Sequence, residues 1–196
     1  MSEYVYLDWA ATCPKVKYPC SAYGTFLNPN ANYAYKEKRL LSEAEDRVKK
    51  AIGAKSGKVI FGGTSSQLIE NLMSVILSSE YSCDVFCSKY EHDSFFRYRD
   101  DSFYDKDELE LLLNQVDNYT IPVVLWQAVQ NITGEIFPTK QIGELVHQYH
   151  GFYICDGTAQ IGHTPIEPNI DGWCDFYCFS GHKLGTELGI GCCWVS

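Results

Sequence analysis

The 196-residue sequence has no long apolar segment and no excess of positive charge. No uninterrupted apolar run approaches the roughly eighteen residues that a membrane-spanning helix requires. Sixteen lysines and arginines stand against 25 aspartates and glutamates, which gives a net charge of −9. Such a balance argues against a broad surface for phosphate-rich partners. We therefore expect neither nucleic acid nor a membrane as a partner.

A secretory signal, an internal repeat and a low-complexity linker are also missing from the sequence. The first residues, MSEYVYLDWAA, do not show a basic segment followed by an apolar one, so we expect a cytoplasmic protein. Hydrophobic residues make up 45% and charged residues 21%, which is typical of a globular chain. The length suits one domain with a substantial core.

The nine cysteines include no C-x-x-C pair. Most of them lie in apolar, strand-like runs such as FYIC and DFYCFS. This pattern favours reduced, packed thiols over a disulfide framework. The pairs Cys83/Cys87 and Cys174/Cys178 are spaced more loosely than the ligands of a structural zinc site. No metal site is therefore expected.

Apolar runs alternate with amphipathic segments along most of the chain. The periodicity predicts helices over residues 40–54, 67–79, 105–116 and 139–151 and strands over residues 58–61, 84–87, 122–126, 152–155, 175–180 and 189–195. Asp105 and Glu108 have capping-box spacing, and the last helix is expected to run from a Thr139 cap to a stop at Gly151. Uniformly apolar strands alternating with helices predict an α/β fold, a three-layer αβα arrangement around a mainly parallel sheet.

In such folds ligands bind at the carboxyl ends of the strands. The first strand is followed by Gly62-Gly63-Thr64-Ser65-Ser66 and then by a helix. Small residues, hydroxyls and a helix N-terminus together suggest a phosphate cradle. No lysine follows at the spacing of a Walker loop. Taken alone, the run favours a serine cap after a glycine turn.

Four further polar residues follow later strands: His92, Asn131, Asp156 and Lys183. Each has an ordinary structural explanation by itself, as a solvated histidine, a turn asparagine, a helix-capping aspartate or a surface lysine. Together with the phosphate cradle, they match what pyridoxal 5'-phosphate (PLP) needs. A lysine forms the Schiff base, an aspartate keeps the ring nitrogen protonated, and the histidine and the asparagine contact the ring and its oxygen.

These residues stand in motifs that resemble the class V aminotransferase family, most closely its cysteine desulfurases. YLDWAAT, NPNANY, VIFGGTSSQ, EHDS, QNITGEIFP and DGTAQIGHTPI occur in family order, and FSGHKLGTELGIG is the most specific of them. The resemblance covers almost the whole chain. It implies a PLP-dependent transferase large domain of fold type I over residues 1–196, without the C-terminal small domain of the family.

The resemblance also implies a role for each matched residue. Lys183 matches the Schiff-base lysine, and His92 matches the ring-stacking histidine, which is also a candidate acid or base. Asp156 matches the partner of the pyridine nitrogen, and Asn131 the asparagine near the ring oxygen. The remaining cofactor positions fall in the phosphate loop and after the last parallel strand, at Thr64, Ser65, Ser66, Ser180 and His182.

The sequence departs from the family pattern at several places. Trp9 replaces an asparagine, residues 185–188 replace Tyr-Gly-Pro-Lys, and Ala159 stands where the family has a glutamine beside the cofactor. Gln160, one position later, is a candidate replacement for that glutamine. In relatives, a C-terminal half supplies the carboxylate-binding arginine and the nucleophilic cysteine, and residues 184–196 contain no arginine. An ordinary loop thiol is the favoured interpretation of Cys13, and a position near the cofactor, which no other cysteine offers, is the alternative.

Two functions follow from the resemblance. The first is a PLP-dependent cysteine desulfurase-like enzyme, with the amino acid bound as an aldimine, that mobilises sulfur from L-cysteine as a homodimer or with a partner chain. The alternative is a non-catalytic or split-component remnant of the class V aminotransferase fold, acting as a scaffold or partner subunit.

Overall fold

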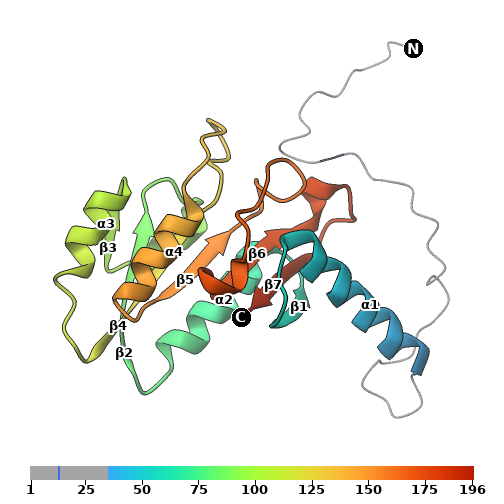
Figure 1. The fold of residues 1–196 in the computed structure, drawn as a ribbon, viewed down its shortest axis with the longest axis horizontal. Coiled ribbons are helices and arrows are strands. Elements are labelled where there is room, and N and C mark those ends of the chain that lie inside the picture. The colour runs from blue at the N-terminus through green and yellow to red at the C-terminus, as the bar shows by residue number, and fades with distance from the viewer. Residues whose placement is uncertain (1–12, 14–34) are drawn as a thin grey trace.

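The computed structural model describes Cys13 and residues 35–196, whose path is drawn in Figure 1. The described helices are α1 (Tyr35–Ile52), α2 (Ser65–Leu77), α3 (Lys106–Leu113) and α4 (Thr139–Gln148). Short 3-10 helices are η1 (Asp93–Tyr98), η2 (Ile170–Gly172) and η3 (Gly181–Leu184). The strands are β1 (Lys58–Gly62), β2 (Ser82–Ser88), β3 (Asp101–Phe103), β4 (Thr120–Gln127), β5 (Phe152–Asp156), β6 (Phe176–Ser180) and β7 (Gly191–Val195).

The seven strands form one sheet in the order β1-β7-β6-β5-β4-β2-β3. The strands β3, β2, β4, β5 and β6 are parallel to their neighbours, whereas β7 runs antiparallel to both β6 and β1. The predicted mainly parallel sheet is therefore confirmed, with one reversed strand. Parallel pairing brings the carboxyl ends of β2, β4, β5 and β6 to the same edge, where ligands bind in such sheets.

Helices cover both faces of the sheet, which confirms the α/β fold. Successive residues of β4 point to opposite faces, so Val123 and Leu125 pack with α2, while Val124 and Trp126 pack with α3 and α4. The α3/α4 side also includes Ile52 of α1. Figure 1 shows α3 and α4 over the β3–β5 end of the sheet and α1 beside β1.

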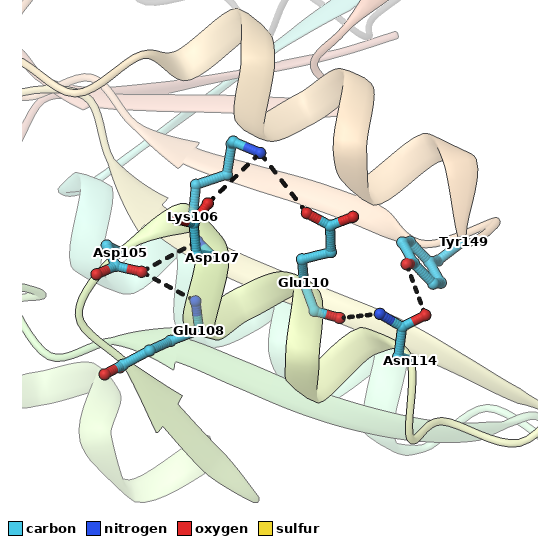
Figure 2. Close-up of polar contacts among 7 residues, drawn as sticks. All are labelled: Asp105, Lys106, Asp107, Glu108, Glu110, Asn114 and Tyr149. Carbon is cyan, nitrogen blue, oxygen red and sulfur yellow. Dashed lines mark hydrogen bonds and ion pairs between the residues drawn. The ribbon is translucent and has the colours of Figure 1, made fainter.

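The predicted start of α3 is confirmed in most of its detail. The Asp105 carboxylate accepts the backbone N–H groups of Asp107 and Glu108 at 3.0 and 2.9 Å (Figure 2). In a standard capping box the glutamate would bind the N–H of the cap residue. Here Glu108 instead accepts the N–H of Tyr104 at 2.8 Å, one residue earlier. At the other end, the Tyr149 hydroxyl donates to Asn114 and links the ends of α3 and α4.

Both predicted ends of α4 differ from the structure. Pro138 occupies the cap position, and Thr139 is the first helical residue, with its hydroxyl buried and without a partner among the described residues. A helical Thr139 cannot cap the turn that it begins. The helix ends at Gln148, and His150, with φ of 57°, takes the left-handed position that was expected of Gly151. Gly151 is needed for space instead, since a Cβ there would lie 2.6 Å from the Pro122 oxygen.

The short edge strand β3 was not predicted, because three residues are too few to show a period. Trp9 and the motifs YLDWAAT and NPNANY lie outside the described residues. No helix in the described part of the chain is long and apolar enough to cross a membrane. The eight cysteines within it form no disulfide with one another, and six of them are buried.

Candidate functional site

A cavity of about 200 Å³ opens at the carboxyl edge of the sheet. The polar residues that follow β1, β2, β4, β5 and β6 converge on it, as expected for parallel strands. Its walls are formed by Ser65, Ser66, His92, Gln127, Asn131, Asp156, Thr158, Ala159, Ser180, His182 and Lys183. Every site residue predicted from the sequence is among them except Thr64 and Gln160.

The N-terminus of α2 forms one wall of the cavity. Thr64 caps this helix, because its hydroxyl accepts the backbone N–H of Gln67 at 3.1 Å. Ser65 and Ser66 begin the helix, and its first turn carries no acidic residue. The helix dipole therefore favours a bound anion at this end.

Three hydroxyl groups from three different elements meet beside that helix end. The Ser65 hydroxyl lies 2.9 Å from the Thr158 hydroxyl and 3.1 Å from that of Ser180. The Ser65 N–H donates to the Ser180 hydroxyl at 2.8 Å, and the Ser180 N–H donates to that of Thr158 at 3.2 Å. All three side chains are buried. The cluster locks α2 against β6 and the turn after β5, so its donors keep a fixed geometry.

Asp156 ends β5 and is directly opposite Gln127 of β4. Its Oδ1 accepts the Thr158 N–H at 2.9 Å. The pKa of Asp156 is raised above its ordinary value, chiefly by burial, and the bonds from Thr158 and the charges of Lys183 and His92 offset only part of that rise. The next residue must be glycine, since a Cβ on Gly157 would lie 2.0 Å from Cζ of Tyr177.

Lys183 lies in the turn η3 between β6 and β7. The turn is closed by Gly185, whose φ is 84°, and is held to β7 by the Gly181 N–H, which donates to the Ile190 oxygen at 2.8 Å. Burial and the neighbouring Lys183 lower the pKa of His182, so its ring is neutral at pH 7. The Cys13 N–H donates to the His182 oxygen at 3.1 Å, which brings the backbone of this cysteine to the lysine turn.

His92 and Asn131 form the outer part of the cavity, and both are exposed. His92 follows β2, and its ring lies edge-on to Phe95, with ring centroids 6.2 Å apart. Asn131 lies in the loop after β4, where the Gln130 side chain accepts the N–H groups of Ile132 and Thr133. The preceding glutamine therefore holds the loop that carries Asn131.

Gln160 does not reach the cavity. Its amide accepts the Tyr177 hydroxyl at 3.0 Å and donates to the Pro165 oxygen at 3.1 Å, and its side chain is 2% exposed. Ala159 lines the cavity in its place. A second cavity of about 400 Å³ shares Ala159, Asn131 and Lys183 with the first and extends to His163 and Thr164.

Sequence reasoning missed two residues of the site, Gln127 and Thr158. Each had a signal, because Gln127 directly follows the predicted strand PVVLW and Thr158 comes two residues after Asp156. Their importance depends on contacts across the sheet. The Thr158 hydroxyl meets a serine 93 positions away in the chain.

Three comparisons with known proteins agree with one another. The family model described as Aminotransferase class-V matches residues 5–196. A probable cysteine desulfurase of Chlamydia muridarum is 31% identical over 96% of this chain and 52% of its own length. A cysteine desulfurase IscS of Dictyoglomus turgidum is 27% identical over the whole chain and 55% of its own length. The chain thus spans about half the length of these curated relatives.

Solved structures show the same fold. A NifS-like protein from Rickettsia africae superposes with a TM-score of 0.82 at 23% identity, over 98% of this chain and 58% of its own. A structure titled SspA in complex with cysteine gives a TM-score of 0.76 at 22% identity, over 97% of this chain and 60% of its own.

Proposed function

Because this chain belongs to the class-V aminotransferase family, we propose that it binds PLP at the cavity around Lys183 and acts on an amino acid, with L-cysteine as the first candidate. The observation that carries the proposal is the meeting, in one cavity, of an anion-binding helix end, a carboxylate, a histidine, an asparagine and a lysine amine. We further propose that residues 1–196 act as one large domain.

The residues of the cavity fit the chemical groups of PLP. Its phosphate suits the N-terminus of α2 and the three hydroxyls of Ser65, Thr158 and Ser180. Ser66 and the neutral His182 ring complete that end. Thr64 contributes indirectly, by capping α2, and Gln160 contributes by supporting the turn after β5.

Asp156 is suited to hold the protonated ring nitrogen. It is the carboxylate that lines the cavity, and Lys183 and His92 both favour its charged form. When bound, PLP supplies an electron sink for charge that develops at the amino acid. Asp156 keeps that sink effective by holding a proton at the nitrogen, and the exposed His92 and Asn131 flank the ring and its oxygen.

Lys183 has two roles in this proposal. Its amine would hold PLP covalently, and in its free form the same amine would accept the α proton of the amino acid, a task that His92 would share. We assign the group that binds the substrate carboxylate to a partner copy or a partner chain. The thiol that takes up sulfur is assigned to one of these or to Cys13. We propose a homodimer as the assembly.

Cysteine as the substrate rests on similarity. The curated relatives are named cysteine desulfurases, and one structural neighbour is titled as a complex with cysteine. Among the described residues, those that line the cavity include neither an arginine nor a cysteine, which favours a second candidate, a cofactor-binding scaffold or split component that needs a partner for turnover.

The test uses purified protein incubated with PLP, reduced with borohydride and digested for peptide mapping. We expect a visible absorption band and a reduced cofactor on Lys183, both lost in Lys183→Ala. Cofactor fixed at another lysine would refute the assignment. Addition of L-cysteine should then shift the band and release alanine; a band that does not respond favours the scaffold. Light scattering with size-exclusion chromatography checks the dimer.

A further inference from the structure

One buried carboxyl group beside the cavity has no role in the proposed function. Glu91 follows β2, directly before His92, and is 5% exposed. One of its oxygens, Oε1, accepts the backbone N–H of Gln127. The other, Oε2, is buried and has no hydrogen-bond partner among the described residues. A buried carboxylate with one free oxygen is costly, so this arrangement requires an explanation.

Gln127 links Glu91 to the strand that carries Asp156. It ends β4, is 5% exposed, and is opposite Asp156 in the β4–β5 register. While its backbone N–H donates to Glu91, its side-chain amide donates to the Tyr90 oxygen. Two bonds therefore join the segment before His92 to the end of β4. Since β4 lies between β2 and β5, Glu91, Gln127 and Asp156 form a row across the edge of the sheet.

The surroundings of the two carboxyl groups differ in charge. Burial raises the pKa of Asp156, but bonds from Thr158 and the charges of Lys183 and His92 oppose that rise and favour its charged form. Burial, and then the charge of Asp156, raise the pKa of Glu91 well above its ordinary value of 4.5, and the bond from Gln127 opposes them only in part. Cys87 and Tyr153, which face Glu91 from within the sheet, carry no positive charge. Lys89, Tyr90 and His92 line a cavity with Glu91 on its outer side, and neither Lys89 nor His92 forms a hydrogen bond to the buried Oε2. When one of these two carboxyl groups carries a proton, that group is therefore Glu91.

We propose that Glu91 is a positioning residue, a neutral carboxylic acid that fixes the His92 turn against the Asp156 strand through Gln127 and leaves the negative charge of the row on Asp156. The part of this proposal that concerns a bound cofactor rests on the proposed function. The sequence shows Glu91 only as a polar residue next to a more obvious histidine.

The test compares Glu91→Gln, Glu91→Ala and the control Glu110→Gln, whose side chain is 46% exposed. A neutral acid resembles glutamine, so Glu91→Gln should bind PLP within about twofold of the original chain. Glu91→Ala leaves the Gln127 N–H without an acceptor and should bind PLP about tenfold more weakly. It should also shift the pH midpoint of the visible band by about half a unit, whereas Glu91→Gln and Glu110→Gln leave that midpoint unchanged.

The melting temperature without cofactor gives an independent readout. Because the pKa of Glu91 is raised in the folded state, its contribution to stability is complete below pH 4.5 and is lost as the pH rises toward the folded value. Glutamine does not titrate, so Glu91→Gln should melt increasingly above the original chain between about pH 5 and pH 8.

Either of two results would overturn the proposal. A Glu91→Gln variant that melts lower than the original chain at pH 8 would mean that Glu91 is ionised and paired. A Glu91→Ala variant with unchanged PLP affinity and spectral midpoint would mean that Glu91 does not position the site. If the original chain binds no PLP, the proposed function fails, and the melting curves still test the state of Glu91.

Discussion

At the scale of single residues, the anion-binding end of the site depends on hydroxyl groups that hold one another. Thr158 bonds the side chain of Ser65 and the backbone of Ser180. It therefore supports both the start of α2 and the end of β6. An aliphatic side chain of the same shape would keep the packing and remove these bonds.

Thr158→Val should accordingly weaken PLP binding about tenfold, because one or two hydrogen bonds that order the phosphate site are lost. Isothermal titration measures the change. Thr120→Val is the matched control. Thr120 lies at the start of β4, at the opposite edge of the sheet, and its hydroxyl donates to the hydroxyl of Ser82. Equal affinities of the two variants would show that the hydroxyl cluster is not part of the phosphate site.

At the scale of elements, the start of α4 shows that a threonine can be buried by packing without capping its helix. Thr139 looks like a helix cap in the sequence, but its buried hydroxyl has no partner among the described residues. Thr139→Val should therefore leave the free energy of unfolding unchanged or raise it, whereas loss of a true cap costs about 1 kcal/mol. Urea denaturation decides between the two, and a clear loss of stability would restore Thr139 as a cap.

The turn after β5 allows a sharper test. Gly157→Ala would drive a methyl group into the ring of Tyr177, so we expect a loss of about 2 kcal/mol or more and weaker cofactor binding. Gly172→Ala is the control, because a Cβ at Gly172 has nothing within 4 Å. If the two variants have equal melting temperatures, the turn is able to relax and does not hold Asp156 rigidly.

At the scale of the whole molecule, the site joins both halves of the described chain. The cavity takes residues from α2, near the start, and from η3, near the end. A ligand that fills it should therefore stabilise the entire fold.

PLP at a hundred times its Kd should add about 2.7 kcal/mol, which raises the melting temperature by about 5–10 °C for a chain of this size. Pyridoxal, which lacks the phosphate, should give a much smaller shift, and Lys183→Ala should reduce the shift produced by PLP. Equal shifts with pyridoxal and PLP would contradict the assignment of the α2 end to the phosphate.

Much of the fold followed from local pattern. Continuous apolar runs predicted the strands, because a strand buried on both faces is apolar throughout. A 3.6-residue periodicity predicted the helices, because a helix buried on one face repeats its apolar residues once per turn. The boundaries of α4 were the exception. There Pro138 precedes the first helical residue, His150 takes the left-handed conformation, and Gly151 leaves the space that Pro122 needs.

The sequence by itself determined which chemical groups follow the strands, since Lys183, Asp156, His92 and the serines of α2 are placed by strand ends and motif spacing alone. Only the tertiary structure decided that Gln160 turns away to Tyr177, that Thr158 joins Ser65, and that Glu91 is buried beside Gln127. The physical reason is the separation along the chain of the residues that interact. Strand and helix patterns arise between near neighbours, whereas these bonds join residues 17, 93 and 36 positions apart, and exist only once the strands have paired.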